Sequence, residues 1–182
     1  NHDTDGNLWI TSELSGAARV FGMQNNLEES GYELYIGDKL SDRIFGSYMT
    51  REGKIFFVTD AFLKQYIPGE NQFEGYSPDG MPTFFLITCM FEDSRSNLWF
   101  GTYNGGLYKY IAEKDSFRVY DVRDGLSSNW ISSLSEDHHG NIWIGTWGGG
   151  ITVIKGDELR VYDETNGLPD LKIRSSSSLR AG

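Results

Sequence analysis

The chain has 182 residues, and its 16 lysines and arginines stand against 26 aspartates and glutamates, which gives a formal net charge of −10. This balance, with no basic stripe along the sequence, argues against a nucleic-acid partner, because phosphates need cationic side chains to neutralise them. The single cysteine, Cys89, excludes an intrachain disulfide. Neither a signal peptide nor an apolar run long enough to span a membrane is present.

The first predicted element is a strand around Trp9, at residues 7–11. The stretch 6–11, Gly-Asn-Leu-Trp-Ile-Thr, joins turn-forming residues to an apolar run, which is typical of a strand that follows a turn. The polar stretch 25–31 then predicts a longer loop.

Three further copies of this element follow. Phe56 occupies the Trp position in a degenerate copy at 50–59, and Trp99 and Trp143 occupy it in two fuller copies. The spacings between these positions are 47, 43 and 44 residues. The two fuller copies share an acidic pair, an Asn, the Trp, a Gly-Thr and a Gly-Gly at matching places. A short turn-forming stretch, such as 125–129, precedes each complete copy.

The last copy shows the strand pattern most clearly. Residues 130–135, 141–146, 151–155 and 159–162 are runs with β-branched and aromatic residues, and Gly, Asp and Asn separate them. No window has a sustained helical period of apolar residues. The pattern predicts four strands joined by short turns, which form an antiparallel meander.

A repeat of this length made of short strands predicts an all-β fold, a β-propeller of about four blades that are four-stranded antiparallel meanders. We expect residues 1–182 to form a single β-propeller (fragment) domain. Its approximate repeats are 1–38, 39–82, 83–126 and 127–170, and 171–182 is a lone strand or a disordered tail.

The predicted strands amount to three strands, then three full blades and then one lone strand, and this count allows two interpretations of the ring. The last strand either completes the first sheet and closes a four-bladed ring, or the chain is part of a larger ring. The sequence begins within a blade and residue 1 is not Met, so we expect a piece of a longer protein.

The stretch Leu-Ser-Ser-Asn, followed by Ser-Leu-Ser-Glu-Asp, Gly-Asn-Ile-Trp-Ile-Gly-Thr and Gly-Gly-Gly, resembles the two-component regulator propeller repeat. The likeness is close over 83–170 and looser over 1–82, where 39–82 lacks the Trp and the Gly-Gly. The resemblance implies the extracellular sensor region of a hybrid two-component system, whose parent chain includes a histidine kinase. It also implies a periplasmic or extracellular location, with a membrane reached only through parts of the parent outside this segment.

The repeated residues are predicted to serve the fold. The rings of Trp9, Trp99 and Trp143 should pack between neighbouring blades, where a large ring fills the wedge between splayed sheets. Each acidic pair begins a turn, in which the Asp can accept hydrogen bonds from the backbone two residues on. Cys89 lies in an apolar run and is predicted to be a small core residue.

Residues that differ between the copies are the candidate ligand-binding residues. In a propeller, the turn from strand two to strand three and the link into the next blade lie on the same face. Six residues are predicted there: Arg43, Tyr103, Asn104, Asn129, Trp130 and Trp147. Aromatic rings beside amide or guanidinium groups suit a glycan or another small polar ligand, through stacking and hydrogen bonding. In the alternative interpretation, Trp130 and Trp147 simply pack on adjacent loops.

No metal, cofactor or catalytic site is predicted. Residues 3–7 carry oxygen side chains at alternate positions, as calcium loops do, but the bidentate Glu of such a loop would fall at Leu14. His138 and His139 are expected to point apart in an extended turn, with no third zinc ligand spaced nearby. No nucleophile elbow, phosphate loop or metalloprotease motif occurs.

The sequence therefore favours a sensor or binding module over an enzyme. A polysaccharide lyase or hydrolase propeller and a purely structural interaction propeller are the alternatives. The expected partner is a small molecule or an oligosaccharide, and the open blade edges of a partial ring also predict self-association.

Overall fold

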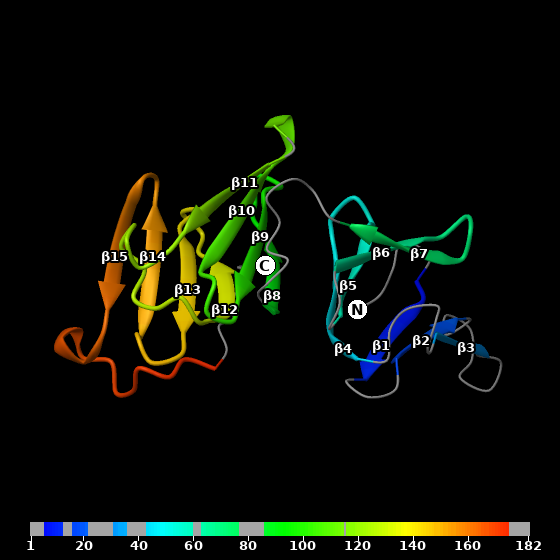
Figure 1. Cartoon of the computed structure of the whole chain (residues 1–182), viewed down its shortest axis with the longest axis horizontal. Coiled ribbons are helices and arrows are strands. Elements are labelled where there is room, and N and C mark those ends of the chain that lie inside the picture. Colours follow the sequence, from blue (N-terminus) through cyan, green and yellow to red (C-terminus); the bar gives the residue numbers. More distant parts are fainter. Residues whose placement is uncertain are drawn as a thin grey trace. The chain divides into compact units, whose positions relative to one another are not determined.

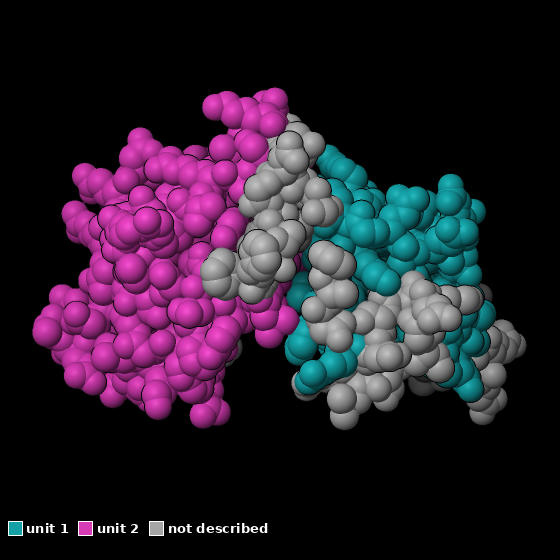
Figure 2. Space-filling model, viewed as in Figure 1, with its two compact units in different colours: residues 1–77 teal, residues 78–182 magenta. Residues whose placement is uncertain are grey.

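The computed structural model describes residues 6–12, 16–21, 31–35, 43–59, 63–76, 86–114 and 116–174. The chain divides into two compact units, Asn1–Ser77 and Pro78–Gly182, which Figure 2 shows in teal and magenta. Most of the predicted loop at 25–31, most of the oxygen-rich loop at 3–7 and the tail after residue 174 lie outside the described residues.

The first unit contains two antiparallel sheets (Figure 1). One has three strands in the order β1-β2-β3, namely β1 (Leu8–Ser12), β2 (Gly16–Phe21) and β3 (Gly31–Tyr35). The other has four strands in the order β4-β5-β6-β7, namely β4 (Ile44–Met49), β5 (Ile55–Thr59), β6 (Leu63–Ile67) and β7 (Gln72–Tyr76).

The second unit contains two four-stranded antiparallel sheets (Figure 1). The first consists of β8 (Ile87–Glu92), β9 (Leu98–Thr102), β10 (Leu107–Ile111) and β11 (Ser116–Tyr120). The second consists of β12 (Ile131–Glu136), β13 (Ile142–Thr146), β14 (Ile151–Lys155) and β15 (Glu158–Tyr162).

Every sheet follows chain order, which is the meander of a propeller blade. The only helical segments among the described residues are two 3-10 turns, Ala112–Lys114 and Glu164–Asn166. The prediction of an all-β propeller fold, with three strands followed by three full blades, is confirmed.

Two of the three repeated Trp residues fill the space between sheets, as predicted. Trp99 of β9 is 3% exposed and belongs to a core cluster with Ile131 and Ile144 of the next sheet. In the first unit, the ring centroid of Trp9 lies 5.3 Å from that of Phe57 and 4.7 Å from that of Tyr66. Both rings are therefore shared by neighbouring blades.

Trp143 differs from these two because it is only half-buried. Its neighbours Ile142 and Ile144 face the core, so alternation along β13 places Trp143 on the opposite face of the sheet. The described residues include no further sheet on that face. The ring stacks on Tyr162 of its own sheet instead, with centroids 5.9 Å apart. The prediction that Trp143 packs between blades is thus not met within the described chain.

The first strand of each four-stranded sheet carries a β-bulge at the same place, where Phe45, Thr88 and Ser132 are the extra residues. In the second unit this residue connects neighbouring blades. The Thr88 hydroxyl donates to the Ile131 carbonyl at 2.6 Å, and the Ser132 hydroxyl donates to the Ile173 carbonyl.

Residues 171–174 form the same kind of backbone hydrogen bond with the last sheet as residues 129–132 form with the sheet before it. The Gly106 N–H donates to the Asn129 carbonyl, and the Gly150 N–H donates to the Leu171 carbonyl, both at 2.9 Å. Lys172 also forms an antiparallel bridge with Trp147. The described part of the predicted lone strand therefore occupies the place of the first strand of a further blade.

Candidate functional site

The candidate face of the second unit lies where β9 and β13 end and β12 begins. The main-chain N–H of Tyr103 donates to the Leu86 carbonyl at 2.8 Å, and that of Trp147 donates to the Trp130 carbonyl at 2.9 Å. These bonds extend the strand pairing by one residue in each sheet. They fix the backbone that carries the three aromatic rings.

The three rings form a continuous row, here named the aromatic ladder (Tyr103, Trp130 and Trp147). The centroids of Tyr103 and Trp130 lie 4.4 Å apart in a T-shaped contact, and those of Trp130 and Trp147 lie 5.3 Å apart in a stack. The ladder therefore crosses from one blade to the next. The Tyr103 side of the ladder is open, because this residue is 45% exposed, whereas the two Trp residues are half-buried.

Two cations that the sequence prediction missed extend this row. The Lys172 ammonium and the Arg174 guanidinium lie 5.6 Å and 5.8 Å from the Trp147 ring centroid. Both residues lie in the segment that continues into a further blade. Their alternate spacing next to an aromatic turn is the signal that could have identified them, because alternate residues of an extended chain share a face.

The other three predicted site residues have different surroundings. The Asn129 side chain accepts a hydrogen bond from the Val122 N–H at 3.0 Å, so it holds the link between the two blades. Asn104 is exposed and has a φ of 66°, a left-handed conformation that Asn tolerates in a turn. Arg43 belongs to the first unit and lies over the Phe45 ring at 5.7 Å. Ligand binding by all six residues stays a prediction.

The acidic pairs have the structural duty predicted for them. Asp93 accepts from the main-chain N–H of Arg95 and of Asn97, and from the Trp99 indole, each at 2.9 Å. Asp137 makes the equivalent bonds to His139, Asn141 and Trp143 in the next blade. In each blade the carboxylate thus fixes both the turn and the orientation of the repeated Trp.

These bonds also control the charge of both carboxyls. Burial on its own would raise the pKa of Asp93, but hydrogen bonds from Trp99 and Asn97 outweigh it and hold the pKa below its ordinary value. On Asp137, burial likewise raises the pKa, and the hydrogen bonds from Trp143 and Asn141 lower it. The net result is again a lowered pKa. Both side chains are therefore ionised structural groups at neutral pH.

Cys89 is half-buried and packs against the core cluster of the second unit, as a small core residue should. Burial raises the pKa of its thiol to about 11. Such a thiol is protonated at neutral pH, so it lacks the thiolate that nucleophilic chemistry needs.

The described part of the chain contains no group of three or more His, Cys, Asp or Glu side chains that could hold a metal ion. The expectation that His138 and His139 point apart is wrong, because their ring centroids lie 3.7 Å apart. The pair occupies a tight turn, not an extended segment, so the alternation of an extended chain does not apply. Within the described residues, no helix has the length and apolar character needed to cross a membrane.

A family model described as the two component regulator propeller matches residues 86–104 and 125–148. These segments contain β9, its following turn, the link into the next blade, β12 and β13, which are the elements that build the aromatic ladder. These two segments are two-component regulator propeller repeats.

Solved structures with similar folds include extracellular domains of bacterial regulatory systems. The extracellular domain assigned to a hybrid two-component system of B. thetaiotaomicron is 23% identical, with a TM-score of 0.76 over 96% of this chain and 23% of that one. The extracellular domain assigned to a one-component system of the same organism is 22% identical, with a TM-score of 0.71 over 88% of this chain and 24% of that one. This chain therefore spans about a quarter of each of these structures, and at such identities the likeness establishes the fold.

An enzyme shares the fold as well. Virginiamycin B lyase from Staphylococcus aureus is 12% identical, with a TM-score of 0.69 over the whole of this chain and 59% of the lyase. No curated protein matches this chain in a sequence comparison. A shared propeller fold does not define the ligand, which depends on the chemistry of the site.

Proposed function

We propose that this chain is a propeller segment of the periplasmic or extracellular sensor region of a two-component signalling protein. We propose further that its aromatic ladder receives a glycan fragment or another small polar ligand. The proposal rests on the repeat family and on one observation above all, the continuous row of Tyr103, Trp130 and Trp147 across two blades.

The ladder has the chemistry that such a ligand requires. An open aromatic face beside polar groups suits a sugar ring, whose C–H face stacks on the ring while its hydroxyls form hydrogen bonds. Asn104 supplies an exposed amide next to Tyr103, and Lys172 and Arg174 supply donors beside Trp147. Because Trp130 and Trp147 already support each other, little side-chain ordering remains when a ligand binds.

A single segment supplies only part of a ring mouth, so its own affinity should be weak, with a Kd of about 1 mM or higher. The test therefore uses the complete sensor region of the parent protein, titrated calorimetrically with a panel of neutral oligosaccharides. The double change Trp130→Ala, Trp147→Ala should weaken binding by about tenfold or more. Tyr32→Ala is the matched control, because Tyr32 is a 71% exposed aromatic side chain of the first unit.

Two outcomes would overturn the proposal. If a ligand binds and the double variant keeps both its fold and its affinity, the ladder is not the binding face. If any glycan of the panel is turned over, the sensor function gives way to the lyase or hydrolase alternative.

A further inference from the structure

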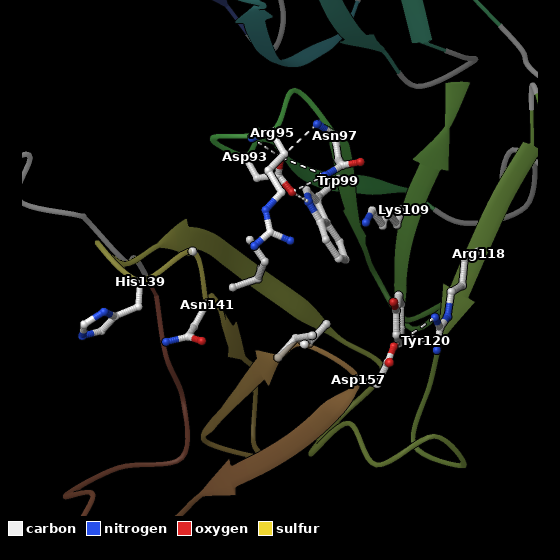
Figure 3. A pocket seen from close by; sticks show the side chains of 14 residues that line it. Asp93, Arg95, Asn97, Trp99, Lys109, Arg118, Tyr120, His139, Asn141 and Asp157 are labelled. Carbon is white, nitrogen blue, oxygen red and sulfur yellow. Dashed lines mark hydrogen bonds and ion pairs between the residues drawn. The ribbon is translucent and has the colours of Figure 1, made fainter. Parts of the chain in front are cut away.

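A pocket of about 300 Å³ lies between the two sheets of the second unit (Figure 3). It is bounded by the turn at 93–97, by β10 and β11, and by the turns at 139–141 and 156–157. The turn at 93–97 precedes β9, whereas Tyr103 follows it. The pocket and the aromatic ladder therefore lie at opposite ends of these two blades.

On one side of this pocket, two cationic side chains are direct neighbours in the β8–β11 sheet. Lys109 of β10 is the Cα partner of both Trp99 of β9 and Arg118 of β11. Directly paired residues project from the same face of a sheet, and like charges directly opposite each other are destabilising. The repulsion between Lys109 and Arg118 thus destabilises the fold when the pocket holds no ligand.

The equivalent rows in the other sheets avoid this arrangement. In the β1–β3 sheet the row is Trp9, Arg19 and Glu33, and the guanidinium pairs with the carboxylate at 3.1 Å. The two remaining rows contain one charged residue each. They are Phe56, Gln65 and Glu74, and Trp143, Val153 and Arg160. Among these four rows, paired cations therefore occur only in the β8–β11 sheet.

A third cation, Arg95, enters the same space from the turn beside Asp93, as Figure 3 shows. Among the residues that the structure describes, neither Arg95 nor Lys109 has a carboxylate within 4.0 Å. Arg118 has one at 4.0 Å, that of Asp157, but this side chain is 99% exposed and its charge is well screened. The pocket is thus locally basic within a chain of net charge −10.

The other carboxylate of the pocket, that of Asp93, forms no ion pair with these cations among the described residues. Both oxygens of Asp93 already accept from Asn97, and one of them also accepts from the Trp99 indole. Aromatic rings support two of the cations instead. The Lys109 ammonium lies 5.1 Å from the Trp99 ring centroid, and the Arg118 guanidinium lies 4.6 Å from that of Tyr120. These contacts position the cations, and the three cations outnumber the two carboxylates of the pocket, Asp93 and Asp157.

We infer that this pocket binds a small organic carboxylate, held by Lys109, Arg118 and Arg95. A carboxylate that enters between the cations removes their repulsion and accepts charge-assisted hydrogen bonds from them. The amides of Asn97 and Asn141 line the same space and supply hydrogen bonds for the uncharged part of the molecule. The volume is at the lower end of the range for ligand pockets, about 300–1,000 Å³, which suits a molecule of about one sugar ring. This site is separate from the ladder and does not depend on the proposed function.

The test is an NMR titration of the ¹⁵N-labelled chain with glucuronate and, separately, with glucose. The two probes share the sugar ring and differ in the carboxylate. Glucuronate should shift the Trp99 indole signal, identified with Trp99→Phe, with an affinity at least about tenfold above that of glucose. Inorganic sulfate is the third probe. If sulfate binds as tightly as glucuronate, the pocket takes a bare oxyanion, and the inference of an organic ligand is overturned.

Variants assign the binding to the cations. Lys109→Val copies Val153 of the next blade and should weaken glucuronate binding by about tenfold. Lys109→Met, which keeps the aliphatic stem over Trp99, guards against a packing effect and should have the same result. Arg160→Gln is the matched control and should leave the affinity unchanged. Equal binding of glucose and glucuronate, or wild-type affinity in both well-folded Lys109 variants, would overturn the inference.

Discussion

The Thr88 hydroxyl donates a hydrogen bond to the Ile131 carbonyl at 2.6 Å and so joins the first strands of two neighbouring blades. The contact exists because a β-bulge adds Thr88 to β8 and directs its side chain out of the regular ladder. Ser132 repeats it one blade later on the Ile173 carbonyl. Bulge hydroxyls are thus a repeated connection between blades of this unit.

Replacing Thr88 by Val should lower the free energy of unfolding of the second unit by about 1 kcal/mol, because the Ile131 carbonyl loses its donor while the side-chain shape is kept. Thr88→Ser retains the hydroxyl and should lose less. Urea denaturation followed by tryptophan fluorescence measures both. A larger loss for the Ser variant than for the Val variant would show that the methyl group matters more than the hydrogen bond.

The two Trp residues of the second unit should differ in their contribution to stability. Trp99→Ala should cost about 3–5 kcal/mol, as expected for a fully buried aromatic ring. Trp143→Ala should cost only about half as much, because its ring is half-buried. Denaturation of the two variants under one set of conditions gives the comparison, and equal losses would mean that another segment covers Trp143.

The lowered pKa of Asp93 and Asp137 predicts acid sensitivity. A carboxyl whose pKa is lower in the folded state contributes stability above its unfolded pKa of about 3.9, and this contribution is lost as the pH falls towards the folded pKa. The free energy of unfolding should therefore decrease below about pH 5. Asp93→Asn should lower stability at pH 7 by about 1–2 kcal/mol and make the acid decrease shallower. An unchanged pH slope in Asp93→Asn would contradict the assignment.

Removal of residues 171–182 tests the role of the segment after the last blade. This deletion should unfold a closed ring, and it should have hardly any effect on the fold of an open one. The structure adds a cost in either case, because Ser132, Gly148 and Gly150 lose their acceptors in this segment. We expect a loss of about 1–3 kcal/mol from the second unit. No loss at all would mean that residues 171–174 are not held against the last sheet.

Self-association is also expected, since sheets that end in unpaired edges favour pairing with another chain. Sedimentation at about micromolar concentration, where a complex of about −8 kcal/mol is half formed, should detect dimers or larger species. A strict monomer would instead favour a ring closed by the C-terminal segment. Repeating the measurement on the truncated chain distinguishes these cases, because loss of a closing strand opens a new edge.

Much of the fold follows from the sequence because it depends on local patterns. Strands alternate with turn residues in each repeat, and the strands predicted at 141–146 and 151–155 agree with β13 and β14 to within one residue. The turn role of Asp93 was also predictable, since its partners Arg95 and Asn97 lie only a few residues away. The His138–His139 geometry was mispredicted, because whether a turn is extended or tight depends on backbone angles that residue types restrict only weakly.

Contacts between blades were decided by the tertiary structure. The sequence determined the period, the strand pattern and the position of each repeated Trp, because these depend on residues close together in the chain. It could not determine that Trp99 is buried while Trp143 is half-buried, since burial depends on which sheet covers the ring. The sequence also could not show that Arg95, Lys109 and Arg118 line one pocket. Their proximity arises only when strand pairing and sheet packing bring distant residues together.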